Sequence, residues 1–400
     1  MTSVESESDL CFNPLDPASY REPYARLAEI RRRCPVSEAL PGHFFVATDG
    51  DARQVLLDFN TFSNAGNFQL DHPDGEVDPP TIVQLDPPRH NLFRRLVAAG
   101  LNPRAVRAAE PFVRETARQL VEKVQSDGRG DLMAFLAQPL PSEVIAHLIG
   151  VPAEHAPDFT RWTAEITSTV PRSFHHLQSW ADFKAFIDRL IAERRADPSP
   201  PDDIVTRLLQ AEEEGTRLDD GEIRMAIFQF IVAGNDTATR LIGNVVHELL
   251  RTRELWERVA ADRSLIPTAI DESLRHDSPI QWVMRRCTTE AAIHGVKVEP
   301  GQRVLVGIGS ANRDETVWAD PDSFSLDRAD VVDKHLAMGS GRHYCLGAPL
   351  GRLEARVALE ALMDLLPSLA LAEGFEIEFV ESAMMRGPKR LDVVWEATRG

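Results

Sequence analysis

One cysteine of the chain is placed where a thiolate could bind a metal. Cys345 belongs to the glycine-rich segment Met338-Gly339-Ser340-Gly341-Arg342-His343-Tyr344-Cys345-Leu346-Gly347, and a helix-forming segment with an early proline follows at 348–356. The unpaired backbone N–H groups and the dipole at a helix start lower the pKa of a thiol. Glycines let the backbone approach a flat ligand closely. The segment therefore suits an axial thiolate of a haem iron, although taken alone it also suits a buried structural cysteine.

A second group of polar residues interrupts an apolar helical stretch. Asn235, Asp236 and Thr237 follow Ala233 and Gly234 there, and buried polar groups need partners or water. The threonine hydroxyl can donate to a carbonyl one turn earlier, while a glycine weakens a helix. We therefore expect a local opening of the helix that admits a ligand or water. Taken alone, such a stretch is usually structural.

A third pattern is an acid–base pair on one helical face. Glu272 and Arg275 are three residues apart within 265–276, a predicted helix, so their side chains are neighbours. An ion pair at this spacing is common on protein surfaces and contributes little to stability. The pair by itself therefore predicts no chemistry.

The elements that must position these residues are mostly helices. Hydrophobic periodicity from about residue 89 predicts helices over 104–126, 131–150, 179–195, 222–251, 253–262 and 265–276. Short strands are expected at 43–48, 293–306 and 376–396, and a loop at 65–80. No alternating βαβ pattern or phosphate-binding glycine loop is visible. The pattern predicts a mainly α fold with small β-sheet regions, in a single domain over 1–400.

Composition excludes some functions. The 44 basic and 62 acidic residues give a net charge of −18, which argues against a general nucleic-acid binder. The chain has four cysteines, at 11, 34, 287 and 345. So few and so widely spaced cysteines indicate a protein of a reducing compartment. The N-terminus lacks the features of a signal peptide, and no apolar run is long enough for a membrane span. We expect a cytoplasmic protein.

Together these patterns resemble the motifs of the cytochromes P450. The cysteine segment is similar to the family's F-G-x-G-x-[HR]-x-C-x-G loop, with Met338 where phenylalanine is usual. The stretch 233–237 is similar to A-G-x-[DE]-T, and the Glu272–Arg275 pair is similar to E-x-x-R, whose third member would be Arg328. The resemblance extends from about residue 86 to the C-terminus. It implies the cytochrome P450 fold of the soluble bacterial type.

The resemblance also implies the roles of the motif residues. Cys345 would be the metal ligand, as the axial thiolate of haem b (heme b). Asp236 and Thr237 would be catalytic residues that deliver protons during oxygen activation. Ala233 and Gly234 would leave room for oxygen.

Further cofactor-binding residues follow from the same resemblance. Within the loop, Met338, Gly339 and Gly347 would surround the thiolate. The two haem propionates would be bound by His90, Arg94, Arg285 and His343, with Arg286 as the rival of Arg285 if the register shifts by one residue.

The implied activity is that of a monooxygenase that inserts one oxygen atom from O2 into a lipophilic small molecule. The chain has no flavin or nucleotide segment, so NAD(P)H-derived electrons would come from a ferredoxin and ferredoxin reductase. Arg95, Lys334, Arg342 and Arg352 are expected on the cysteine side, as a basic docking patch or as ordinary surface. An alternative is a haem-thiolate protein with a non-oxygenating role, such as a peroxide-dependent enzyme, a coupling enzyme or a sensor. The presence of Thr237 argues against that alternative.

Overall fold

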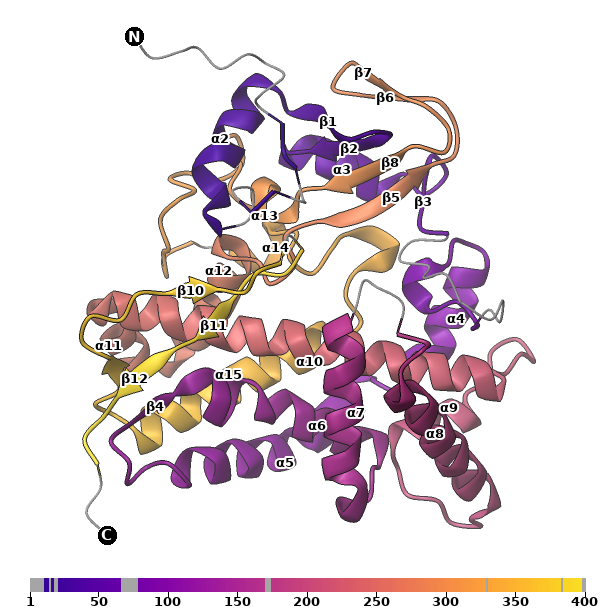
Figure 1. Ribbon diagram of the computed structural model, residues 1–400, viewed down its shortest axis with the longest axis vertical. Helices are drawn as coiled ribbons and strands as arrows, with labels where there is room; N and C mark the ends of the chain where they lie inside the picture. Colours follow the sequence, from indigo (N-terminus) through magenta and orange to yellow (C-terminus); the bar gives the residue numbers. More distant parts are fainter. Residues whose placement is uncertain are drawn as a thin grey trace.

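The computed structural model describes most of the chain (Figure 1). The described residues are 11–13, 16–17, 21–65, 78–169, 174–328, 330–382 and 384–397. Most of the loop expected at 65–80 lies outside these ranges. Among the described helices, none combines the length and the apolar character that crossing a bilayer requires.

A long helix, α10 (Asp220–Arg251), forms the axis of the helical part (Figure 1). It begins with a capping box, in which the Asp219 carboxylate accepts from the Glu222 N–H and the Glu222 carboxylate accepts from the Asp219 N–H. The other principal helices are α4 (Arg89–Ala98), α5 (Pro103–Glu122), α6 (Pro139–Ile149), α7 (Ala156–Thr169), α8 (Gln178–Ala196), α9 (Ile204–Gln210), α11 (Arg253–Ala261), α12 (Ile266–His276) and α15 (Ala348–Leu365). Because α10 packs against α6, α12 and α15, it organises the core.

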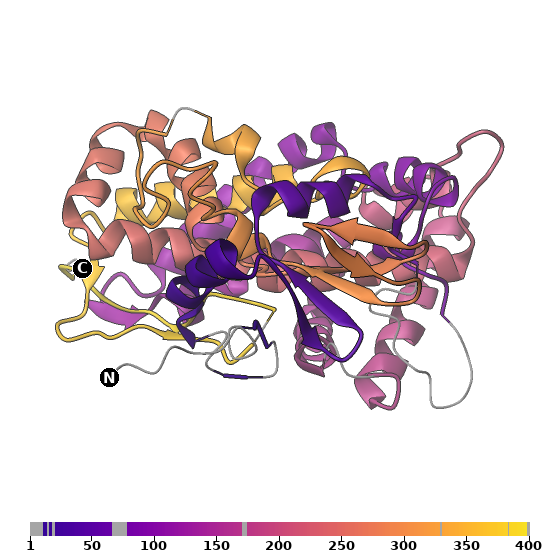
Figure 2. The ribbon, with the colours of Figure 1, turned by 90° about the horizontal axis from the view of Figure 1, so that it is seen from above.

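A five-stranded sheet lies above the helical part in Figure 1. Its strands, in the order β1-β2-β8-β5-β3, are β1 (Val36–Leu40), β2 (His43–Val46), β8 (Arg303–Val306), β5 (Val283–Cys287) and β3 (Phe62–Ser63). The β2–β8 pair is parallel and the other pairs are antiparallel. Figure 2 shows the indigo strands from the start of the chain beside the orange strands from its last third. The sheet therefore joins distant parts of the sequence.

The remaining elements are short. Helices α2 (Pro23–Arg33) and α3 (Asp49–Leu57) precede and follow the first hairpin, and α13 (Ile308–Ala311) and α14 (Val331–Lys334) follow the sheet. The other strands are β4 (Arg129–Asp131), β6 (Ala291–Ile293), β7 (Val296–Val298), β9 (Ala370–Leu371), β10 (Glu378–Phe379), β11 (Pro388–Arg390) and β12 (Asp392–Val394).

The mainly α fold with small β-sheet regions is confirmed, and five of the six predicted helices occur within a few residues of their expected bounds. The single helix predicted over 131–150 is wrong. Strand β4 extends to Asp131, a π-helical turn covers Met133–Ala137, and α6 begins at Pro139. Because proline lacks an N–H, Pro139 is favoured in the first turn of a helix over its interior, although α5 does continue through Pro111.

Candidate active site

The loop that carries Cys345 is closed by its own backbone. The Cys345 N–H donates to the Met338 carbonyl at 2.8 Å, just before α15 begins. Gly339 and Gly341 have φ values of +74° and +65°, which L side chains rarely adopt. A Cβ at Gly341 would also lie 2.9 Å from the Leu57 side chain. These two glycines are therefore required by the shape of the loop.

The electrostatics of the Cys345 sulfur differ from the expectation. Burial raises the pKa of the thiol. The Gly347 and Ala348 N–H groups, together with Arg352 and Arg94, lower the pKa by a smaller amount. The Gly347 and Ala348 N–H groups at the helix start thus lower the pKa as expected, but burial of the free thiol outweighs them. The residue nevertheless keeps accessible surface, so neighbouring residues do not enclose it completely. A bound metal cation would deprotonate it.

The acid–base pair on α12 is completely buried, with both side chains 0% exposed. Arg275 Nε and Nη2 donate to the Glu272 carboxylate at 2.8 and 2.7 Å, and Arg328 Nε donates to Glu272 Oε1 at 3.0 Å. Glu272 Oε1 also accepts from the Ser325 N–H at 2.9 Å. The spacing alone indicated an ion pair on the surface, and that interpretation is wrong. The contact of Arg328 with Glu272 is confirmed. Removing one member of such a network would leave an uncompensated buried charge.

A second contact ties α12 to the cysteine loop. Asp271 Oδ1 accepts from Arg352 of α15 at 2.7 Å and lies 3.1 Å from His335 Nε2, just before the loop. Although burial raises the pKa of Asp271, hydrogen bonds from His335 and Arg352 lower it overall. The carboxylate is thus held ionised. The sequence patterns did not single out Asp271 or His335.

Four cationic or imidazole side chains meet beside the loop. The rings of His90 and His343 lie 4.1 Å apart. Both ring nitrogens of His90 and Nε2 of His343 are buried and find no hydrogen-bond partner among the described residues. Burial lowers the pKa of His343 to about 3, and the charges of His90, Arg285 and Arg94 act in the same direction. This cluster therefore suits negatively charged groups such as carboxylates.

The choice between Arg285 and Arg286 follows from strand geometry. Successive side chains of β5 point to opposite faces. Arg285 is buried, while Arg286 is exposed. Burial lowers the pKa of Arg285 to about 10, while Asp86 raises it. Arg285 therefore belongs to the cluster and Arg286 does not.

The polar turn of α10 contains the predicted catalytic pair. Thr237 Oγ1 donates to the Ala233 carbonyl at 2.5 Å, and the Asp236 carboxylate accepts from Arg240 at 2.8 Å. The opening expected at Gly234 is wrong, because the helix is continuous through this turn. A Cβ built on Gly234 would meet nothing within 4 Å. Open space therefore lies beside the turn without a break in the backbone.

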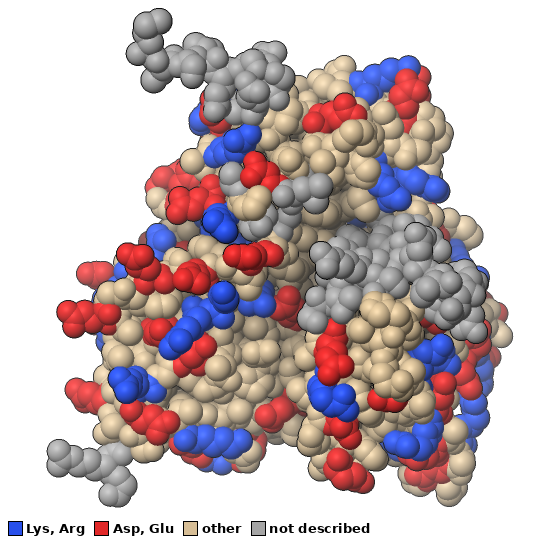
Figure 3. Space-filling view, viewed as in Figure 1, with Lys and Arg blue, Asp and Glu red and all other residues tan. Residues whose placement is uncertain are grey.

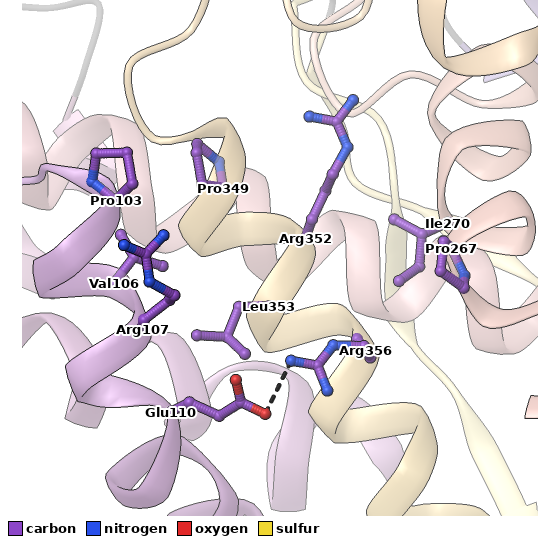
Figure 4. Close-up of a pocket in the computed structure, with 10 residues that line it drawn as sticks. All are labelled: Pro103, Val106, Arg107, Glu110, Pro267, Ile270, Pro349, Arg352, Leu353 and Arg356. Carbon is purple, nitrogen blue, oxygen red and sulfur yellow. Dashed lines mark ion pairs between the residues drawn. The ribbon is translucent and has the colours of Figure 1, made fainter. Parts of the chain in front are cut away.

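A surface pocket of about 340 Å³ lies between α5, α12 and α15 (Figure 4). Its polar lining consists of Arg107, Glu110, Arg352 and Arg356, with Arg356 paired to Glu110 at 3.0 Å. Its apolar lining consists of Pro103, Val106, Pro267, Ile270, Pro349 and Leu353. Because Pro349 and Arg352 belong to the first turns of α15, the pocket lies on the cysteine side of the molecule. The sequence patterns missed Arg107 and Arg356.

Three of the basic residues expected to form a docking patch on the cysteine side have partners within the chain. Arg95 pairs with Glu213 at 2.6 Å, and Lys334 pairs with Asp330 at 3.1 Å. Arg342 donates to Asn91 at 3.0 Å. On the face shown in Figure 3, acidic and basic side chains are interspersed among the described residues.

Comparison with known proteins decides the family. The family model described as Cytochrome P450 matches residues 42–366. The chain belongs to the cytochrome P450 family. It is 33% identical over 387 residues to the mycinamicin IV hydroxylase/epoxidase of Micromonospora griseorubida, across 92% of this chain and 95% of that protein.

Two further comparisons agree with the family assignment. The steroid C26-monooxygenase of Mycolicibacterium smegmatis is 31% identical over 340 residues, which are 84% of this chain and 83% of that protein. The solved structure of cytochrome P450 CYP109Q5 from Chondromyces apiculatus superposes with a TM-score of 0.88 at 34% identity, covering 96% of this chain and 98% of that one. The protein is a cytochrome P450 monooxygenase, and hence an oxidoreductase.

A P450 carries a haem whose iron is bound by a cysteine thiolate, and the residues present fit that group. Cys345 would hold the iron, because the residue keeps accessible surface and its sulfur accepts from the Gly347 and Ala348 N–H groups. The propionates would be held by His90, Arg94, Arg285 and His343, where buried ring nitrogens lack partners among the described residues.

Proposed function

We propose that the enzyme is a haem-thiolate monooxygenase that inserts one oxygen atom from O2 into a lipophilic small molecule. The observation that carries this proposal is the position of Cys345, which keeps accessible surface and lies two residues after His343 of the His90–Arg94–Arg285–His343 cluster. When bound, haem supplies the oxygen and electron-transfer chemistry that amino-acid side chains lack. The protein supplies the thiolate, the protons and the shape of the substrate site.

We assign proton delivery to Asp236 and Thr237. The Asp236 side chain is 42% exposed, so its carboxylate can exchange protons with solvent. Thr237 Oγ1, which donates to the Ala233 carbonyl, would pass a proton toward the open space beside Gly234. Ala233 and Gly234 keep that space free because neither carries a large side chain.

Aromatic side chains between α8 and α10 form a buried apolar cluster, and we expect a substrate beside it to be lipophilic. Phe174, Trp180 and Phe228 lie with ring centroids 4.9 to 5.1 Å apart. Two relatives are named for a steroid and for mycinamicin IV, which also favours a large, weakly polar molecule. Gln281, a buried polar residue after α12, uses its side-chain amide to donate to the Ser278 carbonyl at 2.7 Å and to the Tyr24 hydroxyl at 3.3 Å, so that amide is engaged within the protein.

We assign the pocket of Figure 4 to the electron donor, a ferredoxin reduced by its NAD(P)H-dependent reductase. Arg352 and Arg356 are paired with acids at 2.7 and 3.0 Å, whereas Arg107 is exposed at the rim. An apolar lining beside the exposed Arg107 suits an acidic protein surface. Arg107→Glu should lower the rate of reduction by ferredoxin and weaken its dependence on salt. Arg189→Glu on α8 serves as the control; equal rates for both variants would contradict the assignment.

The proposed activity is tested by the spectrum of the reduced, carbon monoxide-treated protein. A red-shifted Soret band of the thiolate type is expected, and Cys345→Ala should abolish it. Absence of this band from the wild-type protein would overturn the proposal. Product formation with ferredoxin, reductase and O2 would then distinguish an oxygenase from a haem-thiolate protein with another role.

A further inference from the structure

One arginine links the catalytic turn of α10 to the C-terminal hairpin, which is formed by the antiparallel strands β10 and β11. Arg240 Nη2 donates to Asp236 Oδ1 at 2.8 Å, and Nη1 of the same guanidinium donates to the Pro388 carbonyl at 2.9 Å. Pro388 begins β11 and lies 148 residues further along the chain. The guanidinium therefore joins the Asp236 carboxylate to a different part of the fold.

The position of this guanidinium is fixed by packing. The Arg240 side chain is only 17% exposed, whereas Asp236 is 42% exposed. A Cβ on Gly387 would lie 2.5 Å from Arg240 Cδ and 2.8 Å from its Cβ. The arginine stem therefore occupies the space that a side chain at position 387 would need. Glycine at 387 is what allows Arg240 to reach the Pro388 carbonyl.

The hairpin segment next to Arg240 also pairs with the segment after α12. The Gln281 N–H donates to the Met384 carbonyl at 2.8 Å, and the Arg386 N–H donates to the Pro279 carbonyl at 2.9 Å. Asn244, one turn beyond Arg240 on α10, donates to the Arg386 carbonyl at 3.3 Å. Arg240 is thus anchored to a backbone that is itself held at several points.

We propose that Arg240 is a positioning residue for proton delivery, which holds the Asp236 carboxylate in one orientation beside Thr237. This inference rests on the proposed monooxygenase function. The step moves protons only: the Asp236 carboxylate takes up a proton from solvent and gives it to Thr237 Oγ1 as that hydroxyl passes its own proton on, which returns Asp236 to the carboxylate that accepts from Arg240. A half-exposed carboxylate without this anchor would populate several rotamers. Reduced oxygen would then more often be released without product.

The inference is tested with holoenzyme variants that disturb the contact from both sides. Arg240→Ala removes the guanidinium, and Gly387→Ala displaces it. Arg240→Lys keeps the positive charge but cannot donate to Asp236 and to the Pro388 carbonyl with the geometry of a guanidinium. The matched control is Arg253→Ala, because Arg253 pairs with Glu257 at 3.0 Å with the same i,i+4 spacing and donates to the Leu369 carbonyl at 2.7 Å. Gly50→Ala controls for the glycine change, since a Cβ there meets nothing within 4 Å.

Arg240→Ala and Gly387→Ala should each lower product per electron consumed by roughly tenfold, with KM changed less than about twofold. Both should increase the solvent isotope effect, and Arg240→Lys should restore part of the loss. In the Asp236→Asn background, Arg240→Ala should have no further effect. Crystal structures of the holoenzyme variants should show Asp236 in more than one orientation, a readout independent of turnover.

The outcomes separate this inference from the function on which it rests. Full coupling in Arg240→Ala and Gly387→Ala, with Asp236 in its original orientation, would overturn the role of Arg240 alone. A wild-type protein that shows no thiolate-type band or forms no product would overturn the proposed function, and this inference with it.

Discussion

The two sides of the candidate site are held in different ways. On the cysteine side, Glu272 and Arg275 are completely buried and share a network with Arg328 and backbone groups. On the α10 side, Asp236 is 42% exposed and Thr237 donates only within its own helix. Buried charges in such networks fix one geometry and are costly to disturb. The ligand loop is therefore built for rigidity, whereas the catalytic turn retains freedom to move protons.

The largest effect is expected from breaking the buried network on the cysteine side. Glu272→Gln leaves two arginines without their counter-charge and should destabilise folding by about 3–5 kcal/mol. Thermal and urea unfolding would measure this loss. The control is Glu257→Gln, which disturbs the exposed pair with Arg253 at 3.0 Å and should cost less than about 0.5 kcal/mol. Similar losses for both variants would remove the contrast between buried and surface pairs.

The next effect concerns retention of haem. Arg285→Ala removes a buried cation from the cluster that would bind the propionates and should weaken haem affinity by about 1.5–3 kcal/mol. Transfer of haem to a competing acceptor protein would measure the change. Arg286→Ala is the matched control, because its exposed side chain lies on the opposite face of β5. Faster haem loss from Arg286→Ala than from Arg285→Ala would contradict the assignment.

A smaller effect on stability, but a clear effect on chemistry, is expected on the α10 side. Thr237→Ala should fold and bind haem normally. Among the described residues, the Thr237 hydroxyl hydrogen-bonds to the Ala233 carbonyl of its own helix, so its loss breaks no contact between elements. Product per electron should fall by at least about tenfold, since general acid catalysis is lost. The measurement is product formed per NAD(P)H consumed. Full coupling in this variant would show that protons reach oxygen by another route.

The last effect appears only as the pH changes and concerns one buried acid on the cysteine side. Glu354 of α15 is buried, and burial raises its pKa from 4.5 to about 8. The folded state therefore binds one more proton than the unfolded state between these values, so stability falls as pH rises through that window. Glu354→Gln should match the wild type near pH 5 and exceed it at pH 8, by at most about 1.4 kcal/mol per pH unit. Urea unfolding at several pH values would test this; a gain independent of pH would contradict it.

Contiguous motifs could be read from the sequence because their chemistry is local. The loop around Cys345 and the polar turn of α10 are each a run of neighbouring residues, so they were predicted without knowledge of the fold. Burial could not be predicted in the same way. The spacing of Glu272 and Arg275 is the same on a surface and in a core, and the pKa of the Cys345 thiol depends on surrounding atoms.

Contacts between distant segments were also beyond the sequence. Arg285 could be separated from Arg286 only when the pairing of β5 with β8 showed which side chain points inward. The contact of Arg240 with Pro388 spans 148 residues, and no pattern in either segment predicts that the two meet. The pocket beside α15 likewise arises where three separate helices meet.

In the proposed role of the cluster of His90, Arg94, Arg285 and His343, the amount of this protein in a cell would depend on the supply of haem. Before haem binds, these groups disfavour one another's positive charge, so newly made chains lack a stabilising contribution at this point. A ligand present at a hundredfold excess over its Kd adds about 2.7 kcal/mol to the folded state. We therefore expect a host that translates the gene faster than it synthesises porphyrin to lose the surplus chains to proteases. Feeding a haem precursor should raise the yield more effectively than increasing transcription.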